Sequence, residues 1–230
     1  MSFAVAPPDQ VSVPIRNSLL RFPVRRIYCV GRNYDDHVAE MGGIPGREPP
    51  FFFQKPADAI LLDGNFPYPS QSSNVHYEVE LVVVLQSGGR NIPLAESQQH
   101  IFGYAVGLDM TRRDLQAEMK KLGRPWEVAK SFDYSAPMSV IAPKSETGVI
   151  EAAQISLSVN GAVRQDSDIS KMIWNVPEII SELSKLFDLH AGDIIFTGTP
   201  SGVGLVQIGD SLVARITGVG EFSLQVCTPS

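Results

Sequence analysis

The most pronounced hydrophobic pattern in the chain is the run from residue 76 to 85, His-Tyr-Glu-Val-Glu-Leu-Val-Val-Val-Leu. Its apolar, β-branched residues predict a strand, in which alternate side chains share one face. Glu78 and Glu80 therefore point the same way, together with Val82 and Val84. Neighbouring carboxylates raise each other's pKa, and a hard divalent cation that prefers oxygen ligands would relieve this. The alternative is that both glutamates lie on a solvated edge of the sheet.

Short apolar segments elsewhere predict a chain rich in strands. Further strands are expected at residues 24–30, 49–56, 101–109, 138–142, 154–159, 162–165 and 193–197, with closing strands within 208–227. Asn160-Gly161 between two of them is a strong hairpin signal. Many turns follow from 17 prolines and 19 glycines.

Three segments have the pattern of a helix: residues 31–42, 111–123 and 177–187. In the second, Thr111 is the expected N-cap, and Leu115, Met119 and Leu122 form the expected buried stripe. In the third, Asn175 is the expected cap. Its inward positions are Ile179, Ile180, Leu183, Leu186 and Phe187.

Composition and charge exclude several classes of protein. A net charge of −6 without a Lys/Arg cluster argues against a nucleic-acid surface. No apolar run is long enough to span a membrane, and the N-terminus lacks the pattern of a secretory signal. Cys29 and Cys227 are isolated, so we expect reduced thiols and a cytoplasmic protein. No linker separates domains, although residues 1–20 contain prolines and are expected to form an irregular arm along the surface.

His37 and Glu40 lie three residues apart on the first expected helix, and so on one face. A carboxylate beside an imidazole fixes its tautomer and raises its basicity, as a general base for water requires. The alternative is an ordinary pair on the surface.

Asp109 ends a strand directly before a helix, where its carboxylate can complete a site begun by Glu78 and Glu80. Three carboxylates suit Mg²⁺ or Mn²⁺ better than Zn²⁺. Lys130 is expected in a strand, either in a salt bridge or in a functional role. Lys55, at a strand end, is either catalytic or extends into solvent, and we expect the latter. The glycine-rich segment 197–204 lacks the lysine of a phosphate-binding loop, but its N–H groups and Thr199 suit a carboxylate or an oxyanion.

Four stretches taken together resemble the fumarylacetoacetate hydrolase family, and most closely its acylpyruvate hydrolase branch. They are Tyr28-Cys29-Val30-Gly31-Arg32-Asn33-Tyr34, His76-Tyr77-Glu78-Val79-Glu80-Leu81, Gly107-Leu108-Asp109-Met110-Thr111-Arg112-Arg113-Asp114 and Thr197-Gly198-Thr199-Pro200-Ser201-Gly202-Val203-Gly204. The resemblance implies a mainly β, α+β fold: a mixed β-sandwich roll with a few short helices, forming a single catalytic domain over residues 21–230 and assembling as a homodimer.

The resemblance also implies roles for individual residues. Glu78, Glu80 and Asp109 are the expected metal ligands, for Mg²⁺ in the first place and Mn²⁺ or Ca²⁺ as alternatives. His37, Glu40 and Lys130 are the expected catalytic residues, and Arg32, Arg113, Gln116, Gly198 and Thr199 are expected to bind the substrate.

The expected reaction is hydrolysis of the C–C bond of a 2,4-dioxo acid such as fumarylpyruvate, with release of pyruvate. The metal would act as Lewis acid, and water activated by His37 and Glu40 would attack the 4-oxo carbon. Oxaloacetate decarboxylation and isomerisation of a hydroxymuconate-type diacid are alternatives at the same site. A non-catalytic β module in which Ca²⁺ serves only stability is a further alternative, although it leaves His37, Lys130 and Thr199 without a role.

Overall fold

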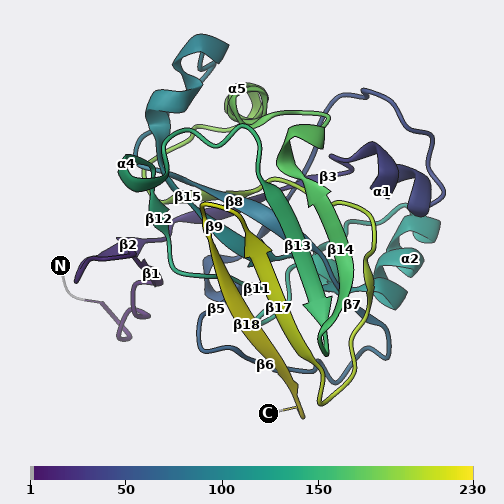
Figure 1. Cartoon of the computed structure of the whole chain (residues 1–230). Coiled ribbons are helices and arrows are strands. Elements are labelled where there is room, and N and C mark those ends of the chain that lie inside the picture. The colour runs from purple at the N-terminus through teal and green to yellow at the C-terminus, as the bar shows by residue number, and fades with distance from the viewer. Residues whose placement is uncertain (1–2, 230) are drawn as a thin grey trace.

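A computed structural model describes residues 3–229, and its body is two β-sheets packed face to face (Figure 1). The larger sheet has six strands. In spatial order they are β12 (Ala142–Pro143), β9 (Ile101–Leu108), β8 (Val79–Leu85), β15 (Asp193–Phe196), β3 (Arg26–Gly31) and β4 (Phe51–Lys55). All neighbours pair antiparallel except β15 and β3, which are parallel, so the sheet is mixed.

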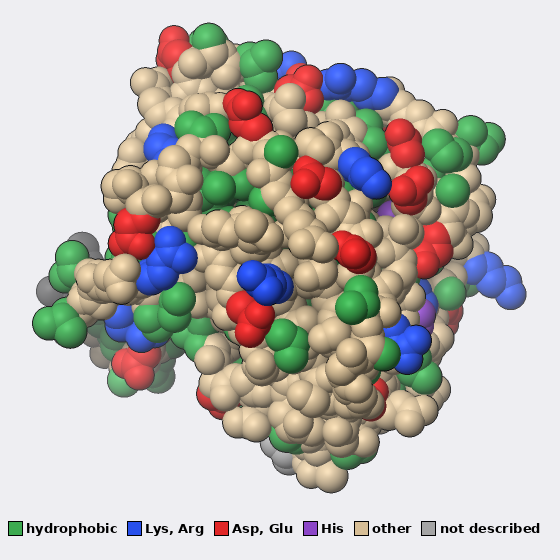
Figure 2. All heavy atoms as spheres, in the orientation of Figure 1, with side chains coloured by type: hydrophobic (Ala, Val, Ile, Leu, Met, Phe, Trp, Pro, Cys, Tyr) green, Lys and Arg blue, Asp and Glu red, His purple; other side chains and the backbone are tan. Residues whose placement is uncertain are grey.

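The second sheet has five strands and includes the expected hairpin. In spatial order they are β14 (Ala162–Asp168), β13 (Gln154–Val159), β17 (Ser211–Ile216), β18 (Gly220–Cys227) and β6 (Asn65–Pro67). The hairpin turn between β13 and β14 is confirmed, with φ of 51° at Asn160 and 79° at Gly161, as a type I′ turn requires. Figure 2 shows that acidic and basic side chains are interspersed over this face of the molecule, which carries no basic patch.

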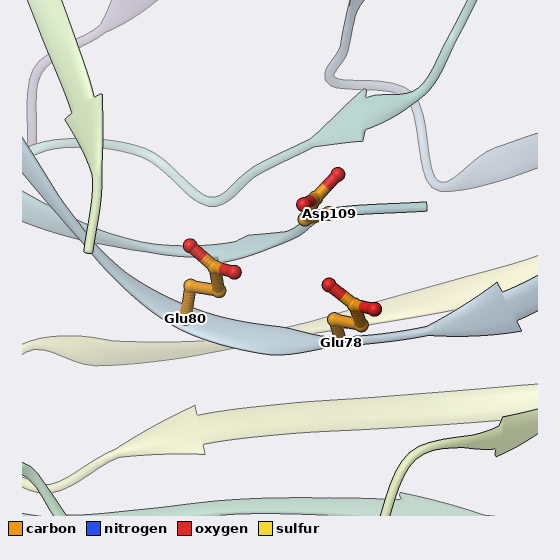
Figure 3. Close-up of side chains that lie close together, drawn as sticks. All are labelled: Glu78, Glu80 and Asp109. Carbon is orange, nitrogen blue, oxygen red and sulfur yellow. The ribbon is translucent and has the colours of Figure 1, made fainter. Parts of the chain in front are cut away.

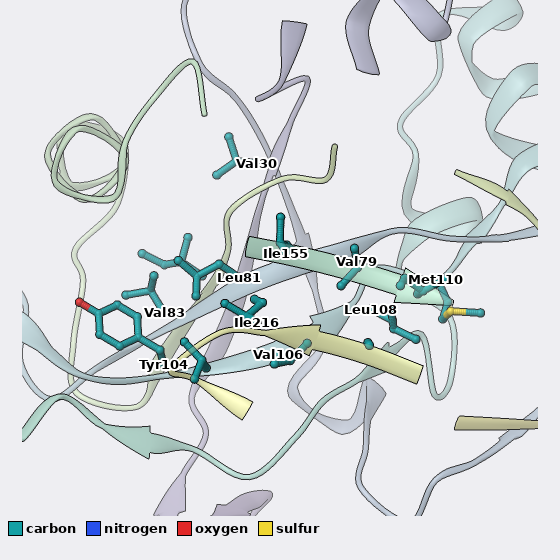
Figure 4. Close-up of a cluster of buried hydrophobic side chains, with 14 of the residues drawn as sticks. Val30, Val79, Leu81, Val83, Tyr104, Val106, Leu108, Met110, Ile155 and Ile216 are labelled. Atoms are coloured by element: carbon teal, nitrogen blue, oxygen red, sulfur yellow. The ribbon is translucent and has the colours of Figure 1, made fainter. Parts of the chain in front are cut away.

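The hydrophobic core lies between the two sheets (Figure 4). Leu81 and Val83 of β8 contact this core together with Ile155 of β13 and Ile216 of β17. The other face of β8 enters a second cluster, which segments 11–24 and 136–141 cover. Because both faces are covered, every residue of β8 is buried, which explains the unbroken apolar run at residues 81–85.

The N-terminal segment is more regular than expected. Residues 3–10 are exposed and lie outside helices and strands, but β1 (Ser12–Pro14) and β2 (Arg21–Pro23) form an antiparallel hairpin. Val13 and Phe22 from this hairpin are buried in the second cluster. The expectation of an irregular arm is therefore wrong from residue 12 onward, while the division into arm and domain stays a prediction.

Short strands and helices complete the fold. A three-stranded sheet consists of β10 (Thr111–Arg112), β7 (Val75–Tyr77) and β16 (Gly204–Leu205), and β11 (Ala136–Pro137) pairs with β5 (Ile60–Leu61). The helices are α1 (Asp35–Glu40), α2 (Arg113–Leu122), α3 (Glu127–Lys130), α4 (Lys144–Thr147) and α5 (Val176–Leu186), and the 3₁₀ turns are η1 (Ala57–Ala59), η2 (Leu94–His100) and η3 (Ile169–Lys171).

These elements confirm the predicted fold class, a mainly β, α+β fold with a few short helices. No helix within residues 3–229 has the length and apolar character to cross a membrane.

Predictions for two helices need correction. Thr111 belongs to β10 rather than capping α2, and Arg112 occupies the N-cap position. The buried stripe on α2 is wrong, since Leu122 is 48% exposed and Gln116 is the buried residue. In α5 the Asn175 cap is confirmed by a capping box, but the inward position predicted for Leu186 is wrong because this side chain is exposed.

Candidate functional site

The predicted strand 76–85 is interrupted at Glu78, and this interruption brings three carboxylates together. Strand β7 ends before Glu78 and β8 starts after it, while Glu80 pairs in register with Gly107 of β9. The chain leaves β9 at Asp109, whose N–H donates to the Glu78 carbonyl at 2.9 Å. Ligand oxygens of Glu78, Glu80 and Asp109 consequently lie within 4.8 Å of one another (Figure 3), and all three residues are buried. The alternative of a solvated edge is therefore wrong.

Three buried or nearly buried cations contact two of these carboxylates. Lys130 Nζ lies 2.8 Å from Glu78 Oε2 and 2.6 Å from Asp109 Oδ2. Lys55 Nζ lies 2.8 Å from Asp109 Oδ1, and Arg113 pairs with Glu78 Oε1. The three carboxylates and the three cations together carry three formal negative and three formal positive charges, so their net charge is zero.

Glu80 differs from its two neighbours, because no cation among residues 3–229 forms an ion pair with it. Its Oε2 accepts a hydrogen bond of 2.8 Å from the Gly198 N–H. Burial, and then the charges of Asp109 and Glu78, raise the pKa of Glu80 well above its usual value. Burial also acts to raise the pKa of Glu78, but the attraction of cations led by Lys130 outweighs it and lowers that pKa. Additional positive charge would therefore be most stabilising beside Glu80.

The donor set fits a hard divalent cation. All three candidate ligands are carboxylates, whose oxygens suit Mg²⁺, Mn²⁺ or Ca²⁺. Asp109 Oδ1 is buried and makes no hydrogen bond, since its approach to Lys55 is an ion pair without hydrogen-bond geometry. This oxygen therefore has no hydrogen-bond donor besides the Lys55 ion pair, and its remaining lone pair is available to a metal ion.

His37 and Glu40 form the second part of the site. His37 Nδ1 lies 3.1 Å from Glu40 Oε2, and Glu40 Oε1 accepts from the Gly202 N–H at 2.9 Å. The His37 side chain is only 10% exposed, so the alternative of a surface pair is wrong for it. Because Glu40 occupies Nδ1, Nε2 is the ring nitrogen left for a proton transfer. Catalytic roles for both residues stay predictions.

The glycine-rich loop that follows β15 connects these two parts. Gly198 has φ of +98°, and a Cβ on it would lie 2.7 Å from the Asn33 Cβ. Its N–H holds Glu80 while that of Gly202 holds Glu40, so the loop positions the protein's own carboxylates. A contact between Gly198 and the substrate stays a prediction.

Gln165 is a residue that the sequence reasoning missed. It lies on β14, fully buried, and its Nε2 donates to Thr199 Oγ1 at 2.9 Å and to the Pro200 carbonyl at 2.8 Å. Its Oε1 accepts from the Val79 N–H at 3.0 Å. Since Thr199 Oγ1 accepts this bond, its hydroxyl proton is available for another acceptor. No motif marks Gln165, because the hairpin pattern alone suggests an ordinary strand residue.

The two lysines lie in other surroundings than expected. Lys130 ends the short helix α3 instead of lying in a strand, and its Nζ also contacts Thr111 Oγ1 at 2.6 Å. Lys55 is buried beside Asp109 rather than extending into solvent, because β4 ends against the carboxylates. Two separate buried cations thus neutralise Asp109.

A small cavity of about 50 Å³ joins these groups. Every predicted site residue except Glu40 and Gly198 lines this cavity, and these two contact His37 and Glu80, which do line it. The predicted residues that line the cavity are Arg32, His37, Glu78, Glu80, Asp109, Arg113, Gln116, Lys130 and Thr199. Helices α1 and α2, which carry His37 and Gln116, lie on the same side of the molecule (Figure 1). Arg32 is at the rim, with a side chain 56% exposed.

Comparisons with known proteins show which proteins this chain resembles. A fumarylpyruvate hydrolase from Pseudomonas aeruginosa, solved in complex with Mn²⁺ and pyruvate, superposes with a TM-score of 0.97 at 51% identity, over 99% of this chain and 100% of that one. A fumarylpyruvate hydrolase from Ralstonia sp is 43% identical over 180 residues, which are 78% of this chain and 93% of the relative.

Another relative has a different recorded activity. A mitochondrial oxaloacetate tautomerase from Rattus norvegicus is 44% identical over 203 residues, 88% of this chain and 91% of the relative.

The model of the family described as "Fumarylacetoacetate (FAA) hydrolase C-terminal" matches residues 26–227 of this chain. The chain therefore belongs to the fumarylacetoacetate hydrolase C-terminal family.

Proposed function

We propose that this protein is a metal-dependent hydrolase that cleaves the C–C bond of a 2,4-dioxo acid, fumarylpyruvate or a related acylpyruvate, and releases pyruvate. The observation that carries the proposal is that the buried His37, held by Glu40, lines the same cavity as the three carboxylates. A hydrolase needs both a base for water and an electrophilic centre that polarises the substrate. The fumarylpyruvate hydrolase likeness, with Mn²⁺ and pyruvate in the solved relative, supports the same reading.

The charges of the site favour an anionic substrate. The three carboxylates are balanced by Lys55, Lys130 and Arg113, so a bound divalent cation would leave an excess of two positive charges. A 2,4-dioxo acid supplies a carboxylate, and the enolate formed on cleavage supplies a second negative charge. The negative charge that develops on the substrate during cleavage would therefore be compensated by the positive charge of the site.

A divalent cation held by Glu78, Glu80 and Asp109 would supply Lewis-acid polarisation of the 2-oxo group and favour the enolate. The chain itself supplies the orientation of the substrate. Thr199 has a free hydroxyl proton for the 1-carboxylate, because its oxygen already accepts from Gln165. Arg113 Nη1 donates to Gln116 Oε1 at 2.7 Å, which leaves the Gln116 amide NH₂ as a donor for the oxyanion that forms at C4.

His37 moves the proton. Glu40 holds the tautomer with a proton on Nδ1, so Nε2 accepts a proton from water while the hydroxide attacks C4. The C3–C4 bond then breaks, its electron pair becomes the pyruvate enolate, and the proton on His37 Nε2 can return to C3. Lys130, the third expected catalytic residue, would donate to the same oxyanion, which requires that one of its three contacts with Glu78, Asp109 and Thr111 be released.

A His37→Ala variant tests the proposal. It should lower the rate of pyruvate release from fumarylpyruvate by about 10²–10⁴-fold, the usual contribution of a general base, and leave Mn²⁺ binding intact. In H₂¹⁸O the wild type should place one label in fumarate for each pyruvate released. His190→Ala is the control, because His190 is half-exposed and does not line the cavity. An unchanged rate in His37→Ala would contradict the assignment.

Oxaloacetate chemistry is the second candidate, because the rat relative acts as an oxaloacetate tautomerase. Neither tautomerisation nor decarboxylation needs water as a nucleophile, so ¹⁸O incorporation at the cleaved carbon separates them from hydrolysis. Measurement of kcat/KM for fumarylpyruvate and for oxaloacetate on one preparation decides which is the main activity. A ratio in favour of oxaloacetate by a hundredfold would overturn the hydrolase proposal.

A further inference from the structure

The small cavity opens into a larger one that the proposed chemistry does not use. The outer cavity has a volume of about 520 Å³ and shares Gly31, Arg32, Val38 and Trp126 with the inner one. Apolar side chains such as Phe51 also line it. The inner cavity, at about 50 Å³, has room for only a small group such as the oxo-acid end of a substrate. The acyl end of a longer substrate would therefore extend toward the junction of the two cavities, where Trp126 and Arg32 line both and Lys120 lines the inner one.

An aromatic wall runs from the inner to the outer cavity. The ring centroids of Phe53 and Trp126 lie 6.3 Å apart, and Phe51 packs on Trp126 at 4.9 Å. Lys130 Nζ lies 5.2 Å from the Phe53 centroid, and Lys120 Nζ lies 5.0 Å from that of Trp126. One lysine thus stands at each end of the Phe53–Trp126 pair.

The two lysines differ in how their charges are compensated. Lys130 contacts Glu78 and Asp109, whereas Lys120 has no ion-pair partner among residues 3–229. Arg32 lines the inner cavity, as Lys120 does. Its Nη1 lies 3.9 Å from Oε2 of its ion-pair partner Glu48, whose side chain is 76% exposed.

The surroundings of Lys120 disfavour its charge. Lys120 is partly exposed, but its partial burial, and then repulsion from Arg113 and Arg32, lower its pKa. Lys120 and Arg32 therefore contribute positive charge that no well-placed carboxylate of the described chain neutralises. Positive charges gathered in a partly buried cavity favour the binding of an anion.

We propose that Lys120, with Arg32, forms a subsite for a second carboxylate at the far end of the acyl group. This inference rests on the proposed hydrolase function and makes it more specific. The preferred substrates are acylpyruvates whose acyl chain itself ends in a carboxylate, with the connecting carbons lying along Phe53 and Trp126. Lys120 then acts in substrate selection and not in bond cleavage.

A matched pair of substrates tests the subsite. Fumarylpyruvate ends in a carboxylate, and crotonylpyruvate has the same acyl chain with a methyl group in that place. Lys120→Met keeps a long apolar stem over Trp126 and removes the charge. It should lower kcat/KM for fumarylpyruvate at least about tenfold, the usual effect of losing one charge-assisted contact, and leave the value for crotonylpyruvate unchanged. Lys120→Arg should retain the preference.

Lys121→Met is the control, since Lys121 is exposed on the same helix, as Lys120 is, but lines neither cavity. It should change neither substrate. An equal loss for both substrates in Lys120→Met, or no loss for fumarylpyruvate, would overturn the subsite.

Failure of the proposed function can be recognised separately. If the wild type cleaves neither acid, the hydrolase proposal fails, and calorimetric titration of the Mn²⁺-loaded protein with both acids tests the subsite alone. Weaker binding of fumarylpyruvate only, in Lys120→Met, supports it. Equal binding of fumarylpyruvate by wild type and variant overturns it.

Discussion

Gly198 is predicted to control the metal site without being a ligand. Its N–H donates to Glu80 Oε2 at 2.8 Å, from a backbone with φ of +98°. In Gly198→Ala the new Cβ would lie 2.7 Å from the Asn33 Cβ, so the loop must move and carry the N–H away from Glu80. Loss of an outer hydrogen-bond partner of a ligand typically costs about 10–100-fold in metal affinity.

Gly218→Ala supplies a control for the backbone cost. Gly218 has φ of +79°, and a Cβ there meets no atom within 4 Å. A left-handed alanine costs about 1–2 kcal/mol in either variant. The clash at Gly198 adds about 1–3 kcal/mol, by analogy with overpacked cores. At about 2–4 °C per kcal/mol, Gly218→Ala should lower the Tm by about 2–8 °C and Gly198→Ala by more.

Two assays on both variants separate stability from metal binding. Thermal unfolding measures the Tm, and calorimetric titration with Mn²⁺ at 25 °C measures the affinity of the folded protein. We expect a lower Tm in both and a weaker Mn²⁺ affinity in Gly198→Ala alone. Wild-type Mn²⁺ affinity in a folded Gly198→Ala protein would refute the reasoning that this N–H positions Glu80.

Three further substitutions test separate parts of the structure. Glu80→Gln removes one of three clustered negative charges and keeps an acceptor for the Gly198 N–H, so the Tm without metal should hold or rise, and Mn²⁺ should no longer raise it. Gln165→Leu removes three buried hydrogen bonds and should lower the free energy of unfolding in urea by about 2–4 kcal/mol, whereas the exposed Gln154→Leu should change it little. Asp114 is partly buried, which acts to raise its pKa, but hydrogen bonds from the Ser72 hydroxyl and backbone N–H groups lower it overall. Its charge therefore stabilises the fold above the unfolded pKa, and this stabilisation is lost as the pH falls through the lower folded pKa. Asp114→Asn should cost less than about 1 kcal/mol at pH 7, with a difference in Tm that vanishes at strongly acidic pH.

The sequence was sufficient to predict the carboxylate group because its positions depend on local rules. Alternation along a strand relates Glu78 to Glu80, and the end of a strand marks Asp109. The Asn160-Gly161 turn and the Asn175 cap are likewise local signals, and both are present in the structure. Strand alternation did not predict the interruption at Glu78, which arises where the chain changes from the small sheet of β7 to the large sheet of β8.

Residues placed by distant parts of the chain could not be identified in this way. Gln165 reaches the site from the second sheet, through contacts with residues 86 and 34 positions away. Lys55 is at a strand end, where a long side chain usually reaches solvent, but here β4 ends against Asp109. The prediction of a buried apolar stripe on α2 is wrong because this helix places Gln116 against the cavity and leaves Leu122 exposed.

The most direct test of the central claim is a titration of metal-free protein with Mn²⁺, followed by both bound metal and pyruvate release from fumarylpyruvate. We predict that activity rises in proportion to occupancy and reaches its maximum at one ion per chain, held by Glu78, Glu80 and Asp109. Full activity in protein that a chelator has freed of divalent metal would contradict the account.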